Sequence, residues 1–530
     1  MTSRQRWTLL ATVIGSGAVF LDGTIVNVAL PRIGRELPNS ILGVLEGQTY
    51  IVSGYLATLA ALLILAGALS DHYGRRRVYA IGLAAFAATS AMCGFAPTLE
   101  TMVVARLLQG AAGALLVPGS LAIISEAFEG EARGRAFGLW ASATSALTIL
   151  GPIIGGLTVD TVGWRIAFLV NVPLAIVGVW ATVRHVAESR DERSSGRFDW
   201  LGALVAALAI GGLAFGLIRG QEREWQDPMA WTALAIGLAG LIAFPLLMAR
   251  RPNPLVPLGL FRSRVFTSLN LATFFIYGAL YVTFSYQSLV LQNVLGYTAL
   301  GAGLIGLPSG LQLVLLSAKV GSSVGRLGSR RFLVAGPLLM AAGLLWYARL
   351  PADSGPWQAS LATPSTLIPP VAAFVDILPA VVLFGLGISM VVAPLTTTLM
   401  SSVPAANTGI ASAINNAIAR VGQPLLGAII FIVVSATFYG ALSARMPDLD
   451  TSSGEVRMMF PPLNPPAASA SADQVTRAAE ASIDAFHLAM LVGAVLLAIG
   501  ALVSWVGLRS TAATTATAAT DAPAEAVASS

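Results

Sequence analysis

Fourteen long apolar stretches limit what this chain can fold into more than any other feature of its sequence. A helix needs about 20 mainly apolar residues to cross the hydrocarbon layer of a membrane. Of the 530 residues, 56% are hydrophobic and 11% are charged, whereas soluble proteins carry roughly 25% charged residues. The sequence therefore predicts an all-α integral membrane protein. The expected spans are 7–30, 47–68, 78–96, 101–124, 136–160, 164–183, 200–219, 229–249, 266–291, 299–319, 332–349, 371–395, 408–437 and 485–507.

Basic residues gather on one side of these spans. Cytoplasmic loops of membrane proteins are enriched in Lys and Arg. With the N-terminus placed inside, 20 of the 31 basic residues fall in inside loops and 9 in outside loops, and the remaining two, Arg106 and Arg420, lie within spans. Both termini are therefore expected in the cytoplasm, which requires an even number of spans.

The sequence argues against an enzyme and against an ATP-driven pump. A P-loop needs Gly-Lys-Ser/Thr, but the single lysine, Lys319, is followed by Val320. Three scattered histidines and one cysteine, Cys93, are too few and too dispersed for a zinc enzyme. We expect no catalytic residue, no cofactor and no metal, and a small molecule rather than nucleic acid as the ligand.

An internal repeat relates two loops of the chain. At an offset of 254 residues, the Gly and Arg positions of 67–78 (GALSDHYGRRRV) match those of 321–332 (GSSVGRLGSRRF), although Asp71 corresponds to Gly325. Related halves are typical of secondary transporters. The predicted organisation is a six-helix bundle (1–183), a linker with two extra spans (184–265), a second six-helix bundle (266–509) with a long, weakly ordered extracytoplasmic loop (438–484), and a disordered cytoplasmic tail (510–530). Within the loop, a helix-like stretch is expected near 473–486.

Asp22 is the only charge in the first apolar stretch, within LDGTIVNVALP (21–31). A carboxylate inside a membrane span is energetically unfavourable and is by default a candidate functional residue. It could carry protons, bind a cation or pack against other helices.

Arg106 begins a second polar motif, RLLQGAAGAL (106–115). Arg106, Gln109, Gly110 and Gly113 fall on one helical face, and the small residues allow close helix contact in lipid. From the rise of a helix, Arg106 lies roughly 8 Å and Asp22 roughly 12 Å from the outer ends of their spans, so the two charges can share a layer. Alternatively, Arg106 extends to the outer lipid headgroups.

Two further motifs carry glycine. In the first repeat loop, Gly67 and Gly74 allow a tight turn, and Asp71 lies one turn before Arg75, which Arg76 follows; ordinary positive charge at a cytoplasmic loop would explain the arginines alone. In LGPIIGGL (150–157), Pro152 favours a bent helix, and Gly151 and Gly155 have the spacing of tightly packed membrane helices. Gly156 follows directly.

These motifs resemble the major facilitator superfamily. Four further stretches resemble its 14-span drug:proton antiporter branch (EmrB/QacA type), namely 198–203 (FDWLGA), 252–266 (PNPLVPLGLFRSRVF), 291–308 (LQNVLGYTALGAGLIGLP) and 409–422 (GIASAINNAIARVG). Together the resemblance covers nearly all of 7–507.

The resemblance implies a plasma-membrane protein that exports small molecules in exchange for protons. Because Asp22 would offer a carboxylate in apolar surroundings, the cargo is expected to be amphipathic and often cationic. The resemblance also implies proton coupling at Asp22 with Arg106, a conformational switch at Gly67, Asp71, Gly74, Arg75 and Arg76, and an antiporter motif at Gly151, Pro152, Gly155 and Gly156. A monomer is expected, and a periplasmic adaptor is left open.

Two other functions remain compatible with the sequence. One is an exporter or uniporter of a single metabolite, in which Asp22 recognises the substrate and transport ignores a collapsed proton gradient. The other is a membrane receptor that binds its ligand without moving it.

Several polar and aromatic residues have weaker assignments. Glu46 is expected to flank the second span, and Asp376 to lie at the interface. Arg420 is interpreted as part of a structural polar patch with Asn415 and Asn416. The aromatic side chains near Tyr281 in the ninth span could line a cavity or simply pack.

Overall fold

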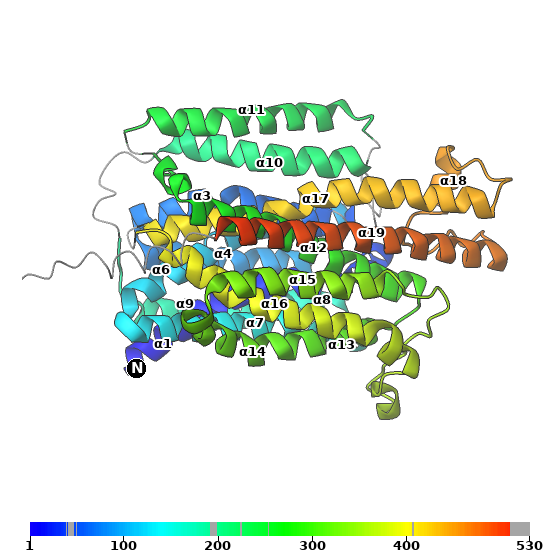
Figure 1. Ribbon diagram of the computed structural model, residues 1–530, viewed down its shortest axis with the longest axis horizontal. Coiled ribbons are helices and arrows are strands. Elements are labelled where there is room, and N and C mark those ends of the chain that lie inside the picture. Colours follow the sequence, from blue (N-terminus) through cyan, green and yellow to red (C-terminus); the bar gives the residue numbers. More distant parts are fainter. Residues whose placement is uncertain are drawn as a thin grey trace, which may run out of the picture.

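The computed structural model describes residues 1–38, 40, 47–48, 50–190, 199–222, 225–252, 254–404 and 407–508 of the chain. Every regular element in these ranges is a helix (Figure 1). The sequence predictions for Glu46 and for the tail 510–530 lie outside the described residues. The helices run along the long axis of the molecule, so they give it two ends. We call the end with Ser3 the terminal face and the end with the short helix α18 (Gly454–Met459) the far face.

One group of helices comes from the first third of the chain. The helix α1 is begun by a capping box, in which the Thr2 side chain accepts from the amide of Gln5, an arrangement that satisfies otherwise unpaired amides at a helix start. Helices α1 and α7 pack along each other, and α4 packs against α5 and α9. The group consists of α1 (Ser3–Glu36), η1 (Tyr50–Gly54), α3 (Tyr55–Tyr73), α4 (Arg75–Gly94), α5 (Leu99–Ala114), α6 (Val117–Ala127), α7 (Gly130–Thr161), α8 (Trp164–Leu169) and α9 (Asn171–His185).

A second group of helices comes from the last half of the chain. Here α15 packs against α16 and α19, and α12 packs against α17 and α19. The group consists of η3 (Leu258–Arg262), α12 (Arg264–Leu289), η4 (Val290–Val294), α13 (Ala299–Ile305), α14 (Leu307–Leu327), α15 (Ser329–Tyr347), η5 (Pro364–Leu367), η6 (Ala373–Ile377), α16 (Leu378–Ser401), α17 (Thr408–Arg445), α18 and α19 (Ala472–Gly507). We refer to these groups as the first and second bundles.

The two inserted helices, α10 (Trp200–Glu222) and α11 (Pro228–Arg250), form a pair on one side of the bundles (Figure 1). Glycines draw them together: a Cβ on Gly212 would lie 2.8 Å from the Ala233 carbonyl oxygen, and one on Gly240 would lie 3.0 Å from the Ala209 Cα. Helix α10 also packs against α3 of the first bundle and α17 of the second. The pair is therefore attached where the two bundles meet.

Twelve helical segments of the described part are long and apolar enough to cross a membrane. The two expected spans without a counterpart among them, 136–160 and 332–349, coincide with α7 and α15. The count of fourteen spans stays a prediction, as do the position of both termini and the exact domain boundaries.

The repeat seen in the sequence has a backbone counterpart. Gly74 joins α3 to α4 with φ of 105°, and Gly328 joins α14 to α15 with φ of 76°. Both values lie in the left-handed region that side chains disfavour. The two glycines match at the offset of 254 residues, so the same turn recurs in both bundles.

The structure differs from the expected loop over 438–484. Helix α17 continues to Arg445, so the connection begins later than the sequence predicts, whereas the start of α19 at Ala472 agrees with the helix-like stretch expected near 473–486. The guanidinium of Arg445 lies 2.7 Å from the Asp484 carboxylate and 3.1 Å from that of Glu480. These ion pairs fasten the ends of α17 and α19 together beyond the apolar spans.

Candidate functional site: a buried ion pair beside a central cavity

Asp22 and Arg106 form an ion pair inside the first bundle. The Arg106 Nη1 donates to the Asp22 Oδ2 at 2.5 Å, and the two side chains are 1% and 0% exposed for Arg106 and Asp22. The Arg106 Nε donates to the carbonyl oxygen of Ile51 at 2.9 Å. Arg106 therefore turns inward, and the alternative in which it extends to lipid headgroups does not hold.

Two amides complete the shell around the Asp22 carboxylate. Its Oδ1 accepts from the Gln109 Nε2 at 3.0 Å and from the Asn171 Nδ2 at 3.1 Å. Since these donors lie on α5 and α9, the carboxylate of α1 ties three helices together. A buried charge is stabilised only when it is paired and hydrogen-bonded, and the charged form of Asp22 meets both conditions.

Small residues bring Arg106 to its position. A Cβ on Gly110 would lie 3.2 Å from the Leu59 backbone nitrogen, and one on Gly113 would lie 3.3 Å from the Leu59 Cδ1, so α5 packs closely on α3. The ring of Tyr55 on α3 then lies 4.1 Å from the Arg106 guanidinium carbon. This distance allows a cation–π contact, which helps to stabilise the buried cation.

The motif of the first repeat loop forms a charged cluster at the terminal face. Arg75 lies 3.0 Å from Asp71 and 3.3 Å from Glu126 at the end of α6. The backbone amide of Arg76 donates to Glu188, which follows α9.

Gly67 lies apart from these charges, at the contact between the two bundles. A Cβ added at Gly67 would lie 3.6 Å from the Ala413 Cβ on α17. Gly67 therefore lies where α3 meets the second bundle and takes no part in the charged cluster, and a Cβ there would make an ordinary van der Waals contact.

The glycines of 150–157 lie on two faces of α7. A Cβ on Gly151 would lie 3.1 Å from the Leu21 carbonyl oxygen and one on Gly155 would lie 2.9 Å from that of Ile25, so both face α1. In contrast, a Cβ on Gly156 would lie 2.8 Å from the Leu300 Cα on α13.

Pro152 faces the second bundle as well. Its carbonyl oxygen would lie 2.6 Å from a Cβ on Gly303 of α13. The backbones of α7 and α13 thus touch near the far face. The motif therefore joins the two bundles as well as packing within the first.

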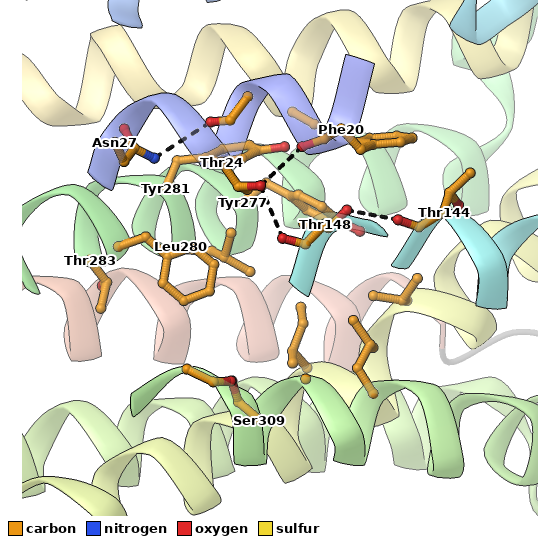
Figure 2. Close-up of a pocket in the computed structure, with 18 of the residues that line it drawn as sticks. Phe20, Thr24, Asn27, Thr144, Thr148, Tyr277, Leu280, Tyr281, Thr283 and Ser309 are labelled. Atoms are coloured by element: carbon orange, nitrogen blue, oxygen red, sulfur yellow. Dashed lines mark hydrogen bonds between the residues drawn. The ribbon is translucent and has the colours of Figure 1, made fainter. Parts of the chain in front are cut away.

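A cavity of about 330 Å³ lies between the bundles. Its lining reaches Met400 and Ser412 near the terminal face, whereas the contact of α7 with α13 closes the far side. The aromatic residues near Tyr281 are part of this lining. Figure 2 shows side chains from four helices around the cavity: Phe20, Thr24 and Asn27 on α1, Thr144 and Thr148 on α7, Tyr277, Leu280, Tyr281 and Thr283 on α12, and Ser309 on α14.

Asp22 does not contribute to this lining. Phe20, Gly23 and Thr24, its neighbours on α1, line the cavity, whereas Asp22 points into the first bundle. No Asp or Glu is found among the described residues that line the cavity, and their one charged side chain is Arg420. A cationic cargo was expected because Asp22 would offer a carboxylate in the binding site, and the position of Asp22 removes that reason.

The sequence did not connect Asn171 with Asp22, and it grouped Arg420 with Asn415 and Asn416 without placing these three residues in a cavity wall. Asn171 is a fully buried amide at the start of α9, and an amide in an apolar span was the available signal. Arg420 lies in the cavity wall rather than only in a structural patch. Asp376 accepts from the Ser354 hydroxyl at 2.8 Å, away from the Asp22 pair. Among the described residues, no three His, Cys, Asp or Glu side chains come together as a metal would require.

Two helix bundles around a central cavity, with twelve segments in the described part of the chain able to cross a membrane, form the architecture of a multi-pass membrane transporter. The chain belongs to the Major Facilitator Superfamily, whose family model matches residues 12–427. Its curated relatives include drug-resistance transporters, and membership of this family makes the chain a transporter rather than an enzyme.

Three relatives illustrate the similarity. The multidrug resistance protein Stp of Mycobacterium tuberculosis is 34% identical over 95% of this chain and 92% of its own length. The tetracenomycin C resistance and export protein of Streptomyces glaucescens is 34% identical over 81% of this chain and 76% of its own. The puromycin resistance protein of Streptomyces alboniger is 30% identical over 85% of each.

Solved structures support the fold. An auto-inhibited peptide transporter of the POT family superposes with a TM-score of 0.61 at 15% identity, covering 96% of this chain and 97% of that chain. A bacterial homologue of the lysosomal transporter Spinster, in an inward-facing and unoccupied conformation, gives a TM-score of 0.57 at 16% identity over 96% and 97%.

Proposed function

We propose that this protein exports amphipathic compounds across the plasma membrane in exchange for protons, with Asp22 as the proton-carrying residue. The observation that carries the proposal is the buried pair of Asp22 and Arg106. The pair is separate from the cavity, but Asp22 belongs to α1, a helix that lines the cavity. The names of the relatives support drug export, because they are called multidrug or antibiotic resistance proteins.

Protonation of Asp22 has a clear physical consequence. It removes the negative charge that Arg106 faces at 2.5 Å. Removing one partner of a buried pair leaves the other charge uncompensated, which typically destabilises the arrangement by about 3–5 kcal/mol. The protonated protein therefore favours another arrangement of α1, α5 and α9, in which Arg106 finds a new partner or water.

The position of Asp22 on α1 connects this change to the cavity. The Thr24 hydroxyl, two residues further along α1, donates to the Thr148 carbonyl oxygen of α7 at 3.0 Å (Figure 2). Both residues line the cavity. A shift of α1 on protonation thus moves the cavity wall and α7, the helix that touches the second bundle. Proton and substrate then occupy different sites and influence each other through α1.

The expected topology assigns the access state. With the N-terminus in the cytoplasm, the far face is extracytoplasmic, and the conformation seen is closed there with its cavity reaching toward the cytoplasm. Protonation and substrate binding would shift the population between this state and its outward-facing counterpart. We expect a monomer with six helices per bundle, and no adaptor is required by this scheme.

The test uses purified full-length protein in proteoliposomes with a pH gradient. Rhodamine 6G and fluorescein ethyl ester report export, and an enclosed pH dye reports proton movement. Asp22→Asn keeps the size of the side chain and one acceptor oxygen but cannot ionise. It should abolish uphill export and proton movement, while downhill exchange of the dye persists.

Asp376→Asn is the matched control, because Asp376 is a carboxylate of the second bundle that is bonded to Ser354 and not to the Asp22 pair. It should retain proton-driven export. If Asp22→Asn still drives uphill export with proton movement, the assignment is wrong. Wild-type export that ignores a collapsed gradient would instead favour an uncoupled exporter.

A further inference from the structure

Arg420 lies in the wall of the central cavity without a negatively charged partner. Its side chain is 4% exposed, on the same helical face of α17 as Ser412 and Asn416, which also line the cavity. Its guanidinium contacts the ring of Phe20 across the bundle interface, at 5.7 Å. No carboxylate lies within ion-pair distance of it among the described residues.

The two buried arginines in the described part of the chain are therefore in opposite situations. Arg106 has a carboxylate, an amide oxygen and a backbone carbonyl as acceptors. Arg420 has an aromatic face, and a cation–π contact contributes only about 0.5–2 kcal/mol, much less than burial of an unpaired charge costs.

Arg420 cannot reach the end of its helix. It stands twelve residues after Thr408, the first residue of α17, and a helix rises 1.5 Å per residue, so the distance is roughly 18 Å. An arginine near a membrane surface can extend its charge to the headgroups, but Arg420 is too deep for this. Its guanidinium is directed at the cavity.

The amide side chains near Arg420 already form hydrogen bonds within α17 or to the neighbouring helix α12. The Asn415 Nδ2 donates to Asn270 and Thr273 of α12, at 3.1 Å and 2.9 Å, which fastens α17 to α12. The Asn416 Nδ2 donates to the Ser412 carbonyl oxygen at 3.0 Å. The charged donors that face the cavity at this place are those of Arg420, and the aromatic side chains of α12 belong to the same lining.

We propose that the central cavity selects aromatic compounds that carry one negative charge, and that Arg420 binds the anionic group. This rests on the proposed function as a drug exporter and specifies its substrate class. A volume of about 330 Å³ suits a small drug-like molecule. The apolar and aromatic wall accepts the ring system, and the guanidinium forms charge-assisted hydrogen bonds to the anion.

Equilibrium binding without any gradient tests the proposal. At pH 8, fluorescein ethyl ester is a monoanion and rhodamine 6G, an ethyl ester on the same xanthene scaffold, is a monocation. Fluorescence anisotropy with the detergent-solubilised full-length protein gives both dissociation constants. The wild type should bind the anionic ester at least tenfold more tightly than the cation.

Substitutions of Arg420 then locate the preference. Arg420→Gln should reduce the preference for the anion by about tenfold or more, since a hydrogen bond to a charged group is lost. Arg420→Lys keeps the charge and should retain most of the preference, which also covers the case that the Gln variant does not fold. Arg349→Gln is the matched control, because Arg349 lies 4.5 Å from the Trp346 ring outside the cavity.

The outcomes separate this inference from the proposed function. A wild type that prefers the cation or fails to bind the anionic ester overturns the substrate class, as does an unchanged preference in Arg420→Gln. If the preference holds but a gradient never drives export, the coupling is wrong and the substrate class stands.

Discussion

Asp160 at the end of α7 accepts a hydrogen bond from the backbone amide of Leu300 at 3.2 Å. Leu300 is in the first turn of α13, so a carboxylate of the first bundle caps a helix of the second. Negative charge at a helix start is favourable because amides there lack partners. This bond stabilises the closed state of the far face.

Asp160→Ala should therefore make the far face open more often. A bond of this kind contributes about 1.5–3 kcal/mol, so we expect a shift of roughly tenfold or more in the population. In a Cys93→Ser background, a cysteine placed at Ser309 in the cavity wall reports it through its reaction rate with an impermeant maleimide added to the far side. An unchanged rate would show that the bond has no part in closure.

Gly156→Val should block closure of the far face. The new Cβ would lie 2.8 Å from the Leu300 Cα and 2.9 Å from the Ala299 carbonyl oxygen, both backbone atoms that cannot move aside singly. Export should fall more than tenfold while the protein stays monodisperse. Gly138→Val on the same helix has no neighbour within 4 Å of its Cβ and should export normally; equal losses in both variants would point to a general effect on α7.

Gly74→Ala should lower stability by about 1–3 kcal/mol, because φ of 105° is unfavourable for a residue with a side chain. The new Cβ would also lie 2.6 Å from the Glu188 carboxylate. Gly328→Ala has φ of 76° but open space around its Cβ, so it separates backbone strain from crowding. Thermal unfolding in detergent measures the stability of both variants. Gly325→Ala is the reference, because Gly325 lies inside α14 with open space around its Cβ, and this variant should not be destabilised.

Asn171→Ala should weaken the first bundle. Asp22 would keep Gln109 and Arg106 as donors but lose the bond at 3.1 Å that connects it to α9. We expect a loss of about 1–2 kcal/mol in stability together with weaker proton-driven export. Asn171→Asp places a second carboxylate beside Asp22 and should be more harmful than Ala; a better-tolerated Asp would mean that Asp22 is not charged in this state.

The all-helical, membrane-spanning architecture could be predicted from the sequence, because the lengths of the apolar stretches and the distribution of charged residues both reflect the membrane. The same reasoning put Asp22 and Arg106 in one layer, and the structure brings them into contact. Spacing along one helix could not show that Asn171, 149 residues away, completes the shell. That contact depends on how α9 rotates against α1.

Two other features could not be predicted from the sequence, because they depend on how the helices pack. Arg420, Asn415 and Asn416 all line the cavity, and helical periodicity alone does not tell which side of α17 faces it. The ends of α17 and α19 hold together through Arg445, Glu480 and Asp484, which are polar residues far apart in sequence. Composition therefore did not show that α17 continues beyond its apolar stretch and is held there to α19 by ion pairs.

The inserted helix α10 makes the two seams between the bundles unequal. One seam, between α3 and α17, is covered by α10 on its outer side, whereas the other, between α7 and α14, has no inserted helix packed against it in the described part of the chain. A lipophilic compound dissolved in the bilayer would thus meet a wall along the first seam and bare bundle helices along the second. Lateral uptake of a compound from the lipid would therefore take place at the seam between α7 and α14.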